Sequence, residues 1–174
     1  MNCTKFSLDT LSAPVGSNQA FRLCRNPETT GPLPLHLFAH GDGSIGSLTE
    51  GYDDYINYFT DGGFVVAEYL SCGLDWACGV KGDEDFLEML KIASYLSESG
   101  DENVDFEFGI SSSGHSSGAR AALMIAAARD TDDYLPSRIS QKITPSMGLM
   151  LDRAFCNGED VCPSREGSVI HQQC

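Results

Sequence analysis

Residues 106–120 read Phe-Glu-Phe-Gly-Ile-Ser-Ser-Ser-Gly-His-Ser-Ser-Gly-Ala-Arg. The apolar run at residues 104–110 predicts a strand, and the alanine-rich stretch that follows the quoted residues predicts a helix. Between the two, Gly114, Ser116 and Gly118 form a Gly-x-Ser-x-Gly pattern. At a strand-to-helix junction this spacing puts the serine on a sharp turn, with its hydroxyl clear of both elements. Gly114 and Gly118 suit the turn, because a Cβ at either position would crowd the helix start against the strand.

This turn would place Ser116 beside the start of the helix. Unpaired backbone N–H groups and the positive end of the helix dipole lie there, and both favour a developing negative charge. Ser116 is therefore a candidate nucleophile. The alternative is a plain serine-rich loop, in which the glycines serve only the geometry of the turn.

The rest of the chain alternates strand-like and helix-like segments. Strands are expected at residues 20–24, as part of an edge hairpin, at 33–39, at 64–69 and just before Asp152, and helices are expected near residues 52–59 and 83–97. This alternation predicts an α/β fold, a mostly parallel sheet with helices on both faces. Ligand sites in such sheets lie at the carboxyl ends of the strands, where both the loop after His40 and Ser116 fall.

Composition and charge limit the classes of protein. The 174 residues are the size of one domain, expected at residues 1–155, with a cysteine-containing polar tail at 156–174. The net charge of −14 argues against a nucleic-acid partner and favours neutral or cationic ones. No apolar run approaches the roughly 20 residues of a transmembrane helix, so no membrane span is expected.

The seven cysteines are many for a reducing compartment, which favours a secreted or periplasmic protein over a cytoplasmic one. The N-terminus lacks the apolar core of a signal peptide, so either a leader has been removed or the chain is cytoplasmic. Local disulfides are expected at the two short loops bracketed by cysteines, Cys72 to Cys78 and Cys156 to Cys162. A zinc site is the weaker alternative, because it lacks a paired C-x2-C motif; its ligands would be Cys156, Cys162, His171 and Cys174. We therefore expect no metal and no other cofactor.

Over residues 33–150 the sequence resembles the α/β-hydrolase family, in the branch of dienelactone hydrolases, chlorophyllases and polyester hydrolases. The resemblance rests on His-Gly-Asp-Gly at residues 40–43, on Asp-Gly-Gly-Phe-Val-Val at 61–66 and on Gly-His-Ser-Ser-Gly at 114–118. It implies Ser116 as the nucleophile, with an oxyanion hole formed by the backbone N–H groups of Asp42 and Ser117. The implied substrate is a small-molecule, lipid or polyester ester.

The family's chain order is serine, acid, histidine. The resemblance also implies two further strands after Ser116, and the sequence supplies one, so the C-terminal part of the family pattern is expected to be missing. Asp152 is the first candidate for the acid and Asp160 the second, and His171 is the only histidine after Ser116. Alternatively, Asp152 is a solvated strand end and His171 a tail residue.

The two earlier histidines near the motifs, His40 and His115, are expected to be structural. The sequence thus predicts a serine hydrolase that cleaves carboxylic esters through an acyl-enzyme on Ser116. A catalytically incomplete α/β-hydrolase-like fragment or a non-catalytic binding protein is the alternative. A phosphate or nucleotide binder is disfavoured, because the glycine-rich residues 41–46 contain neither Gly-Lys-Ser/Thr nor Gly-x-Gly-x-x-Gly.

Overall fold

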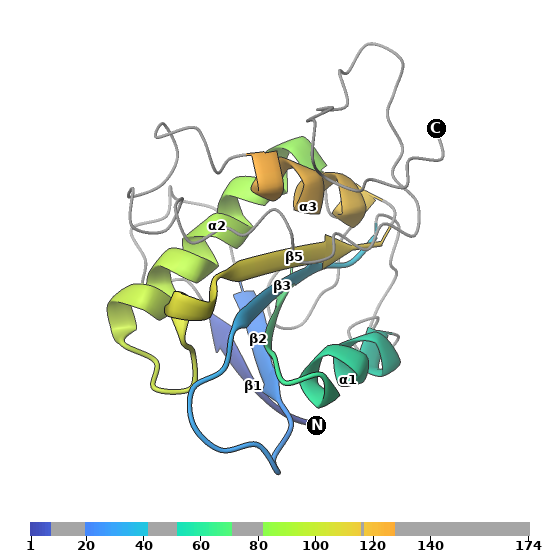
Figure 1. Ribbon diagram of the computed structural model, residues 1–174. Coiled ribbons are helices and arrows are strands. Elements are labelled where there is room, and N and C mark those ends of the chain that lie inside the picture. Colours follow the sequence, from blue (N-terminus) through green and yellow to red (C-terminus); the bar gives the residue numbers. More distant parts are fainter. Residues whose placement is uncertain (8–19, 42–51, 71–81, 116, 128–174) are drawn as a thin grey trace.

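One sheet with the strand order β1-β2-β4-β3-β5 organises the computed structural model (Figure 1). The structure describes residues 1–7, 20–41, 52–70, 82–115 and 117–127. The strands are β1 (Asn2–Ser7), β2 (Ala20–Arg25), β3 (Leu35–Ala39), β4 (Val65–Leu70) and β5 (Ile110–Gly114). The helices are α1 (Asp53–Asp61), α2 (Gly82–Ser99) and α3 (Ser117–Ala127), with a 3₁₀ turn, η2 (Phe106–Phe108).

The sheet is mixed, so the expectation of a mostly parallel sheet is wrong for one half of it. β3 is parallel to both β4 and β5. β1 pairs antiparallel with β2 at the edge of the described sheet, which confirms the edge hairpin expected around residues 20–24, although the residues of β1 were not predicted. β2 is also antiparallel to β4. Helical crossovers force parallel pairing. β1 and β2 precede the first such crossover, so nothing imposes that direction on them.

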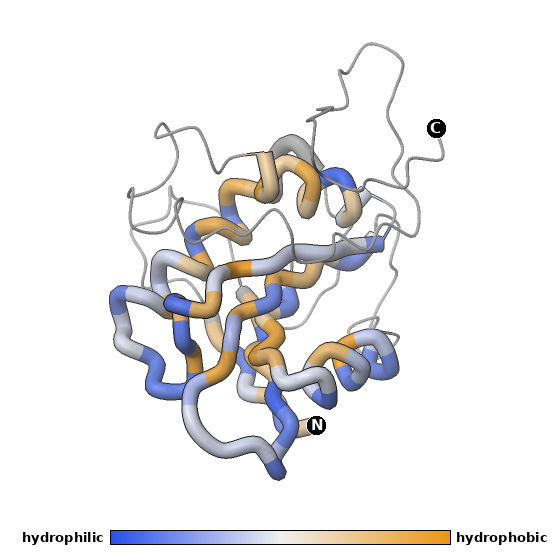
Figure 2. Tube along the Cα trace, viewed as in Figure 1, coloured by the Kyte–Doolittle hydropathy of each residue, from blue (hydrophilic) through white to orange (hydrophobic). Residues whose placement is uncertain are grey.

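Helices cover both faces of the sheet, as the alternation of segments predicted. α1 packs on one face, and α2 and α3 pack on the other (Figure 1). The hydrophobic residues follow this division, and Figure 2 shows hydrophobic positions both in the strands and in the helices that cover them. The core under α1 includes Cys24, Phe38, Ile56 and Val66, and the core under α2 and α3 includes Leu35, Leu37, Met89, Leu90 and Ile125.

β3 lies between β4 and β5, and all five of its residues are buried. Its side chains alternate between the two cores, with Leu35 and Leu37 on the α2 and α3 face and Phe38 on the α1 face. Each fully buried leucine contributes about 1.5–3 kcal/mol of transfer free energy. The expected buried central strand at residues 33–39 is thus confirmed, with its regular part beginning at Leu35.

The strand before the serine turn begins six residues later than expected. Residues 104–110 were expected to be extended, but Phe106–Phe108 form η2, and β5 begins at Ile110. The Asp105 carboxylate accepts a hydrogen bond from the Glu107 N–H and so caps η2, and Gly109 ends it at φ 92°. A side-chain cap and a positive φ at glycine both favour a tight turn over a continuous strand.

The serines at residues 111–113 therefore occupy the strand itself, where all three are buried. Ser112 donates to the Ala122 carbonyl of α3, at 3.1 Å. Ser111 and Ser113 face the opposite core and bond the two ring nitrogens of His36, at 2.8 and 2.6 Å. Every hydroxyl of this buried run thus has a partner, which removes the main cost of placing serines inside a sheet.

Candidate active site

The turn between β5 and α3 is closed by two glycines that tolerate no side chain. A Cβ built on Gly114 would lie 2.2 Å from the Gly118 carbonyl oxygen. A Cβ on Gly118 would lie 2.2 Å from the carbonyl oxygen of Ala39 and 2.4 Å from that of His40. All these atoms belong to the backbone, so a side chain at either position would force the helix away from the sheet. The start of α3 thus packs against its own strand and against the end of β3.

Backbone hydrogen bonds hold the same turn on both sides of Ser116. The His115 N–H donates to the Ala39 carbonyl at 3.0 Å, which extends the pairing of β5 with β3 by one residue. The Gly118 N–H donates to the His115 carbonyl at 2.9 Å and closes the turn into the helix. Ser116 itself lies outside the described residues.

The chain leaving β3 runs beside this turn. His40 is 1% exposed, and its Nδ1 donates to the Gly41 carbonyl at 2.9 Å. The Gly41 N–H donates to the Tyr52 hydroxyl at 3.3 Å, and this hydroxyl lies 2.9 Å from Nδ1 of His115. The loop after β3, the start of α1 and the serine turn therefore meet at one phenol oxygen. The His40 ring thus bonds the backbone and the His115 ring bonds a side chain, and the structural role expected for both histidines stays a prediction.

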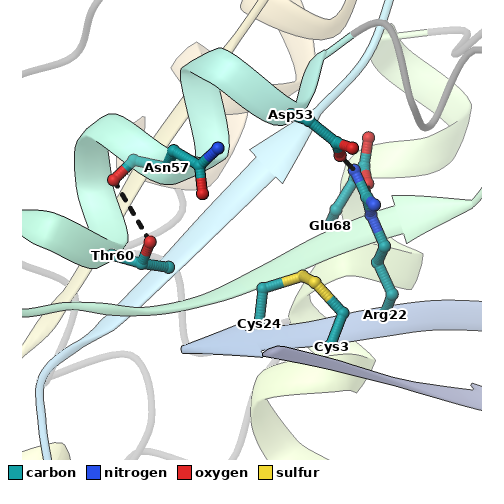
Figure 3. The surroundings of a disulfide bond; sticks show 7 residues. All are labelled: Cys3, Arg22, Cys24, Asp53, Asn57, Thr60 and Glu68. Carbon is teal, nitrogen blue, oxygen red and sulfur yellow. Dashed lines mark hydrogen bonds and ion pairs between the residues drawn. A yellow bond between two sulfur atoms is a disulfide. The ribbon is translucent and has the colours of Figure 1, made fainter. Parts of the chain in front are cut away.

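A buried ion cluster fixes the start of α1 to the sheet (Figure 3). Arg22 of β2 is 6% exposed; its Nη2 donates to the Asp53 carboxylate at 2.7 Å, and its Nε donates to the Glu68 carboxylate of β4. Burial raises the pKa of Glu68 to about 7, although the Arg22 charge opposes this shift. Since Asp53 follows Tyr52 directly, the cluster also restrains the backbone that carries the phenol.

His36 is the other strongly shifted group near the site. Burial lowers the pKa of His36 to about 3, so the ring is neutral at ordinary pH. Its ring stacks on Phe59 of α1, with centroids 3.8 Å apart. The Ser111 hydroxyl lies 3.5 Å from the Leu35 carbonyl oxygen and can donate to it. The Ser111 oxygen then accepts from Nδ1–H of His36, and Nε2 of His36 accepts from the Ser113 hydroxyl. The His36 ring thus joins β3 to β5 through hydrogen bonds at both of its nitrogens.

The residues predicted for the site divide into two groups. Gly114, Ser117 and Gly118 are described, and the structure brings them together at the β5–α3 turn beside the end of β3. The Ser117 hydroxyl is buried and has no hydrogen-bond partner within the described part of the chain. The other predicted residues lie outside the described residues; they are Asp42, Ser116, Asp152, Asp160 and His171.

Sequence reasoning missed Tyr52 and the Arg22 cluster. Tyr52 was recognised only as one apolar position of a helix, although a tyrosine 11 residues after Gly41 can return its hydroxyl to the Gly41 backbone. Nothing local to Arg22 or Glu68 signals their pairing, because they are 46 residues apart and meet through the antiparallel register of β2 and β4.

The cysteine predictions fall mostly outside the described residues, since Cys72, Cys78, Cys156, Cys162 and Cys174 all lie there. In the described part of the chain, a disulfide joins Cys3 to Cys24, which are directly opposite each other in β1 and β2 (Figure 3). Seven cysteines allow many pairings, and this one depends on the register of β1, which the sequence did not locate. Among the described residues, no group of three His, Cys, Asp or Glu side chains could hold a metal ion. No helix in those ranges is long and apolar enough to cross a membrane.

No protein-family model matches the chain, and no curated protein matches its sequence. Solved structures match it in fold. A bacterial heroin esterase is 22% identical over 74% of this chain and 40% of its own, with a TM-score of 0.53. A brefeldin A esterase, described as a bacterial homologue of human hormone-sensitive lipase, is 17% identical over 82% of this chain and 37% of its own, with a TM-score of 0.55.

Esterase 2 of Thermogutta terrifontis is 15% identical over 81% of this chain and 53% of its own, with a TM-score of 0.57. These neighbours are esterases of the α/β-hydrolase fold, and the described part of this chain has the same type of fold. The matched region corresponds to about half or less of each of these proteins.

Proposed function

We propose that this chain carries the nucleophile of a serine esterase, which cleaves carboxylic esters through an acyl-enzyme on Ser116. The observation that carries the proposal is the close backbone packing of Gly114 and Gly118, which stand two residues before and two residues after Ser116 in the sequence. A side chain at either glycine would meet backbone atoms at 2.2 Å, and the two glycines flank the serine at the β5–α3 turn. A plain serine-rich loop has no need of such contacts, whereas a strained turn that presents a hydroxyl depends on them.

The proposed mechanism begins with attack of the Ser116 hydroxyl oxygen on the ester carbonyl while a base removes the hydroxyl proton. The charge that develops on the carbonyl oxygen is stabilised by the backbone N–H groups of Asp42 and Ser117, each contributing about 3–4 kcal/mol. Collapse of the tetrahedral intermediate expels the alcohol, which takes the proton from the base, and water then releases the acid by the reverse sequence. His171 is proposed as the base and Asp152 as the carboxylate that orients it, with Asp160 as the alternative.

The proposed substrate is a small-molecule, lipid or polyester ester. Esters are also what the names of the structural neighbours indicate for those proteins. The net charge of −14 favours neutral or cationic esters over anionic ones. The motifs at residues 40–43 and 114–118 support placing the chain in the dienelactone hydrolase, chlorophyllase and polyester hydrolase branch.

The test is the intact mass of the purified chain after treatment with a fluorophosphonate, which reacts only with an activated serine. We expect a single stoichiometric adduct that is absent in Ser116→Ala. Ser99→Ala is the matched control, because it removes an exposed serine hydroxyl at the end of α2 and should leave the adduct unchanged. His171→Ala should then prevent labelling if His171 is the base.

A folded chain that forms no adduct would overturn the proposal. It would favour the alternative, a protein that keeps the scaffold and turn of an esterase without working catalytic groups. An adduct that persists in Ser116→Ala would likewise show that another serine is the nucleophile.

A further inference from the structure

We infer that Tyr52 is a positioning residue whose hydroxyl joins the two segments that carry the proposed oxyanion hole. This inference rests on the proposed function, because it assigns Tyr52 a part in the same site. The two proposed donors are the backbone N–H groups of Asp42, the residue after Gly41, and of Ser117, at the start of α3. Tyr52 contacts the residue just before Asp42 and the residue just before Ser116.

The Tyr52 hydroxyl makes one hydrogen bond to each of the two segments. The Gly41 N–H donates to the Tyr52 oxygen at 3.3 Å, and the same oxygen lies 2.9 Å from Nδ1 of His115. The Tyr52 oxygen thus links the Gly41 N–H to the His115 ring, and whether the phenol or Nδ1 donates in the second bond depends on the tautomer of the ring. Because the Gly41 N–H is engaged by Tyr52, the loop donor has to come from a later residue, as proposed for Asp42.

The Tyr52 hydroxyl links the two segments just beyond the last backbone contacts between them. The bond from the His115 N–H to Ala39, and the contact of Gly118 with Ala39 and His40, hold the two segments together at their bases. Beyond these contacts, the Tyr52 hydroxyl connects Gly41 to His115. Oxyanion donors act because they are fixed before the charge develops, so a link between their segments bears directly on the rate.

Tyr52 is itself held from two sides. Its ring packs against Phe38 of β3 at 5.2 Å between centroids, and against the His115 ring at 5.7 Å. The next residue, Asp53, is bonded to the buried Arg22, which also bonds Glu68. The start of α1 is thus fixed to the sheet. The Tyr52 side chain is therefore held in place between Gly41 and His115.

The experiment compares Tyr52→Phe with Tyr58→Phe. Both changes remove one phenol oxygen from the α1 region, but Tyr58 is 67% exposed and lies outside the site. With p-nitrophenyl butyrate as substrate, we expect kcat of Tyr52→Phe to fall roughly 10- to 100-fold, while KM changes by less than about twofold. Tyr58→Phe should match the unaltered protein in both constants.

A second readout does not depend on activity. In protein labelled with ¹⁵N-histidine, loss of the hydrogen bond to Nδ1 should move the His115 ring signals in Tyr52→Phe and leave them in place in Tyr58→Phe. If Tyr52→Phe does not fold, His115→Asn and His115→Leu replace it. The Asn side chain keeps a hydrogen-bonding group near the position of Nδ1 and Leu does not, so the Asn variant should retain at least about tenfold more activity.

The outcomes separate this inference from the proposed function. An unaltered protein that neither hydrolyses the ester nor reacts with a fluorophosphonate would overturn the proposed function, and this inference with it. An active protein in which Tyr52→Phe keeps its kcat, or in which the Asn and Leu variants are equally active, would overturn the positioning role alone. A fall in kcat at constant KM, with displaced His115 signals, would support it.

Discussion

Gly118 lies where the start of helix α3 comes closest to the end of β3. Replacing it with alanine would put a Cβ 2.2 Å from the Ala39 oxygen, so the helix has to move. We expect Gly118→Ala to lower the free energy of unfolding by more than about 3 kcal/mol, measured by urea denaturation. Gly62→Ala is the matched control: its φ is −73° and its Cβ would lie 3.3 Å from the nearest atoms, so it should cost less than about 1 kcal/mol. Equal losses in the two variants would contradict the close packing assigned to Gly118.

The sequence predicted tightly packed residues such as Gly118 only where they belong to a recognisable short motif. Gly114 and Gly118 stand in a recognisable spacing, and the sterics of a strand-to-helix turn explain why both are glycines. The partnership of His36 with Ser111 and Ser113 has no such signal, because the residues are 75 or more positions apart and meet only when β3 and β5 pair. A serine run reads as a loop until its hydroxyls have known partners.

The disulfide between β1 and β2 acts at the scale of a strand. Within the described sheet β1 is an edge strand that pairs with β2, and Cys3–Cys24 ties the two together. Closing a loop with a sequence separation of 21 residues stabilises the folded state by about 3 kcal/mol in the chain-entropy account. We expect Cys3→Ala to lower the free energy of unfolding by about 2–4 kcal/mol and to speed amide hydrogen exchange in β1. Thr4→Ala, at the exposed neighbouring position, should change neither quantity appreciably. Unchanged exchange in Cys3→Ala would show that β1 is held by its backbone pairing alone.

At the level of elements, patterns with a helical period were read correctly, and strand limits were less reliable. α1 and α2 agree closely with the segments expected from apolar spacing, since an amphipathic helix carries its own signal along ten or more residues. Residues 106–108 have the composition of a strand, yet they form η2 because the Asp105 cap and Gly109 decide the local backbone. The edge hairpin was expected, but its first strand could not be located, because β1 reads Asn-Cys-Thr-Lys-Phe-Ser and lacks the apolar run that marks β3 and β4.

For the whole molecule, two buried groups give opposite dependences of stability on pH. The pKa of Glu68 rises from 4.5 to about 7 on folding, so unfolding releases a proton between these values and stability falls as pH increases through that range. The pKa of His36 falls from 6.5 to about 3, so unfolding takes up a proton and stability falls as pH decreases from about 6.5 to about 3. The two effects oppose each other between about pH 4.5 and 6.5.

Removing the carboxyl separates the two effects. Between pH 4.5 and pH 7 the unaltered protein should lose stability through Glu68, whereas Glu68→Gln should not. We therefore expect the unfolding free energy of Glu68→Gln, relative to that of the unaltered protein, to increase by roughly 1–3 kcal/mol over this range. Urea denaturation at several pH values measures this difference. Glu28→Gln is the control for the loss of one negative charge, because Glu28 is exposed. A difference that stays constant with pH would contradict the raised pKa of Glu68.

The alternation of segments predicted the α/β class and the placing of helices on both faces, because these follow from patterns that each segment carries by itself. The order and direction of the strands could not be predicted in the same way. Whether β2 enters the sheet parallel or antiparallel to β4 depends on contacts such as Arg22 with Glu68, which exist only after the chain has folded.

The central position of β3 has a consequence for synthesis on the ribosome. Both of its neighbours, β4 and β5, come later in the chain, and His36 is 75 residues before the serine that it faces. At about 5–20 residues per second, this apolar strand emerges roughly 4–15 s before its second partner has been made. During that interval a strand that is fully buried in the finished sheet lacks one of its two neighbours. β3 is therefore where a chaperone should bind during translation, and where aggregation should begin if none does.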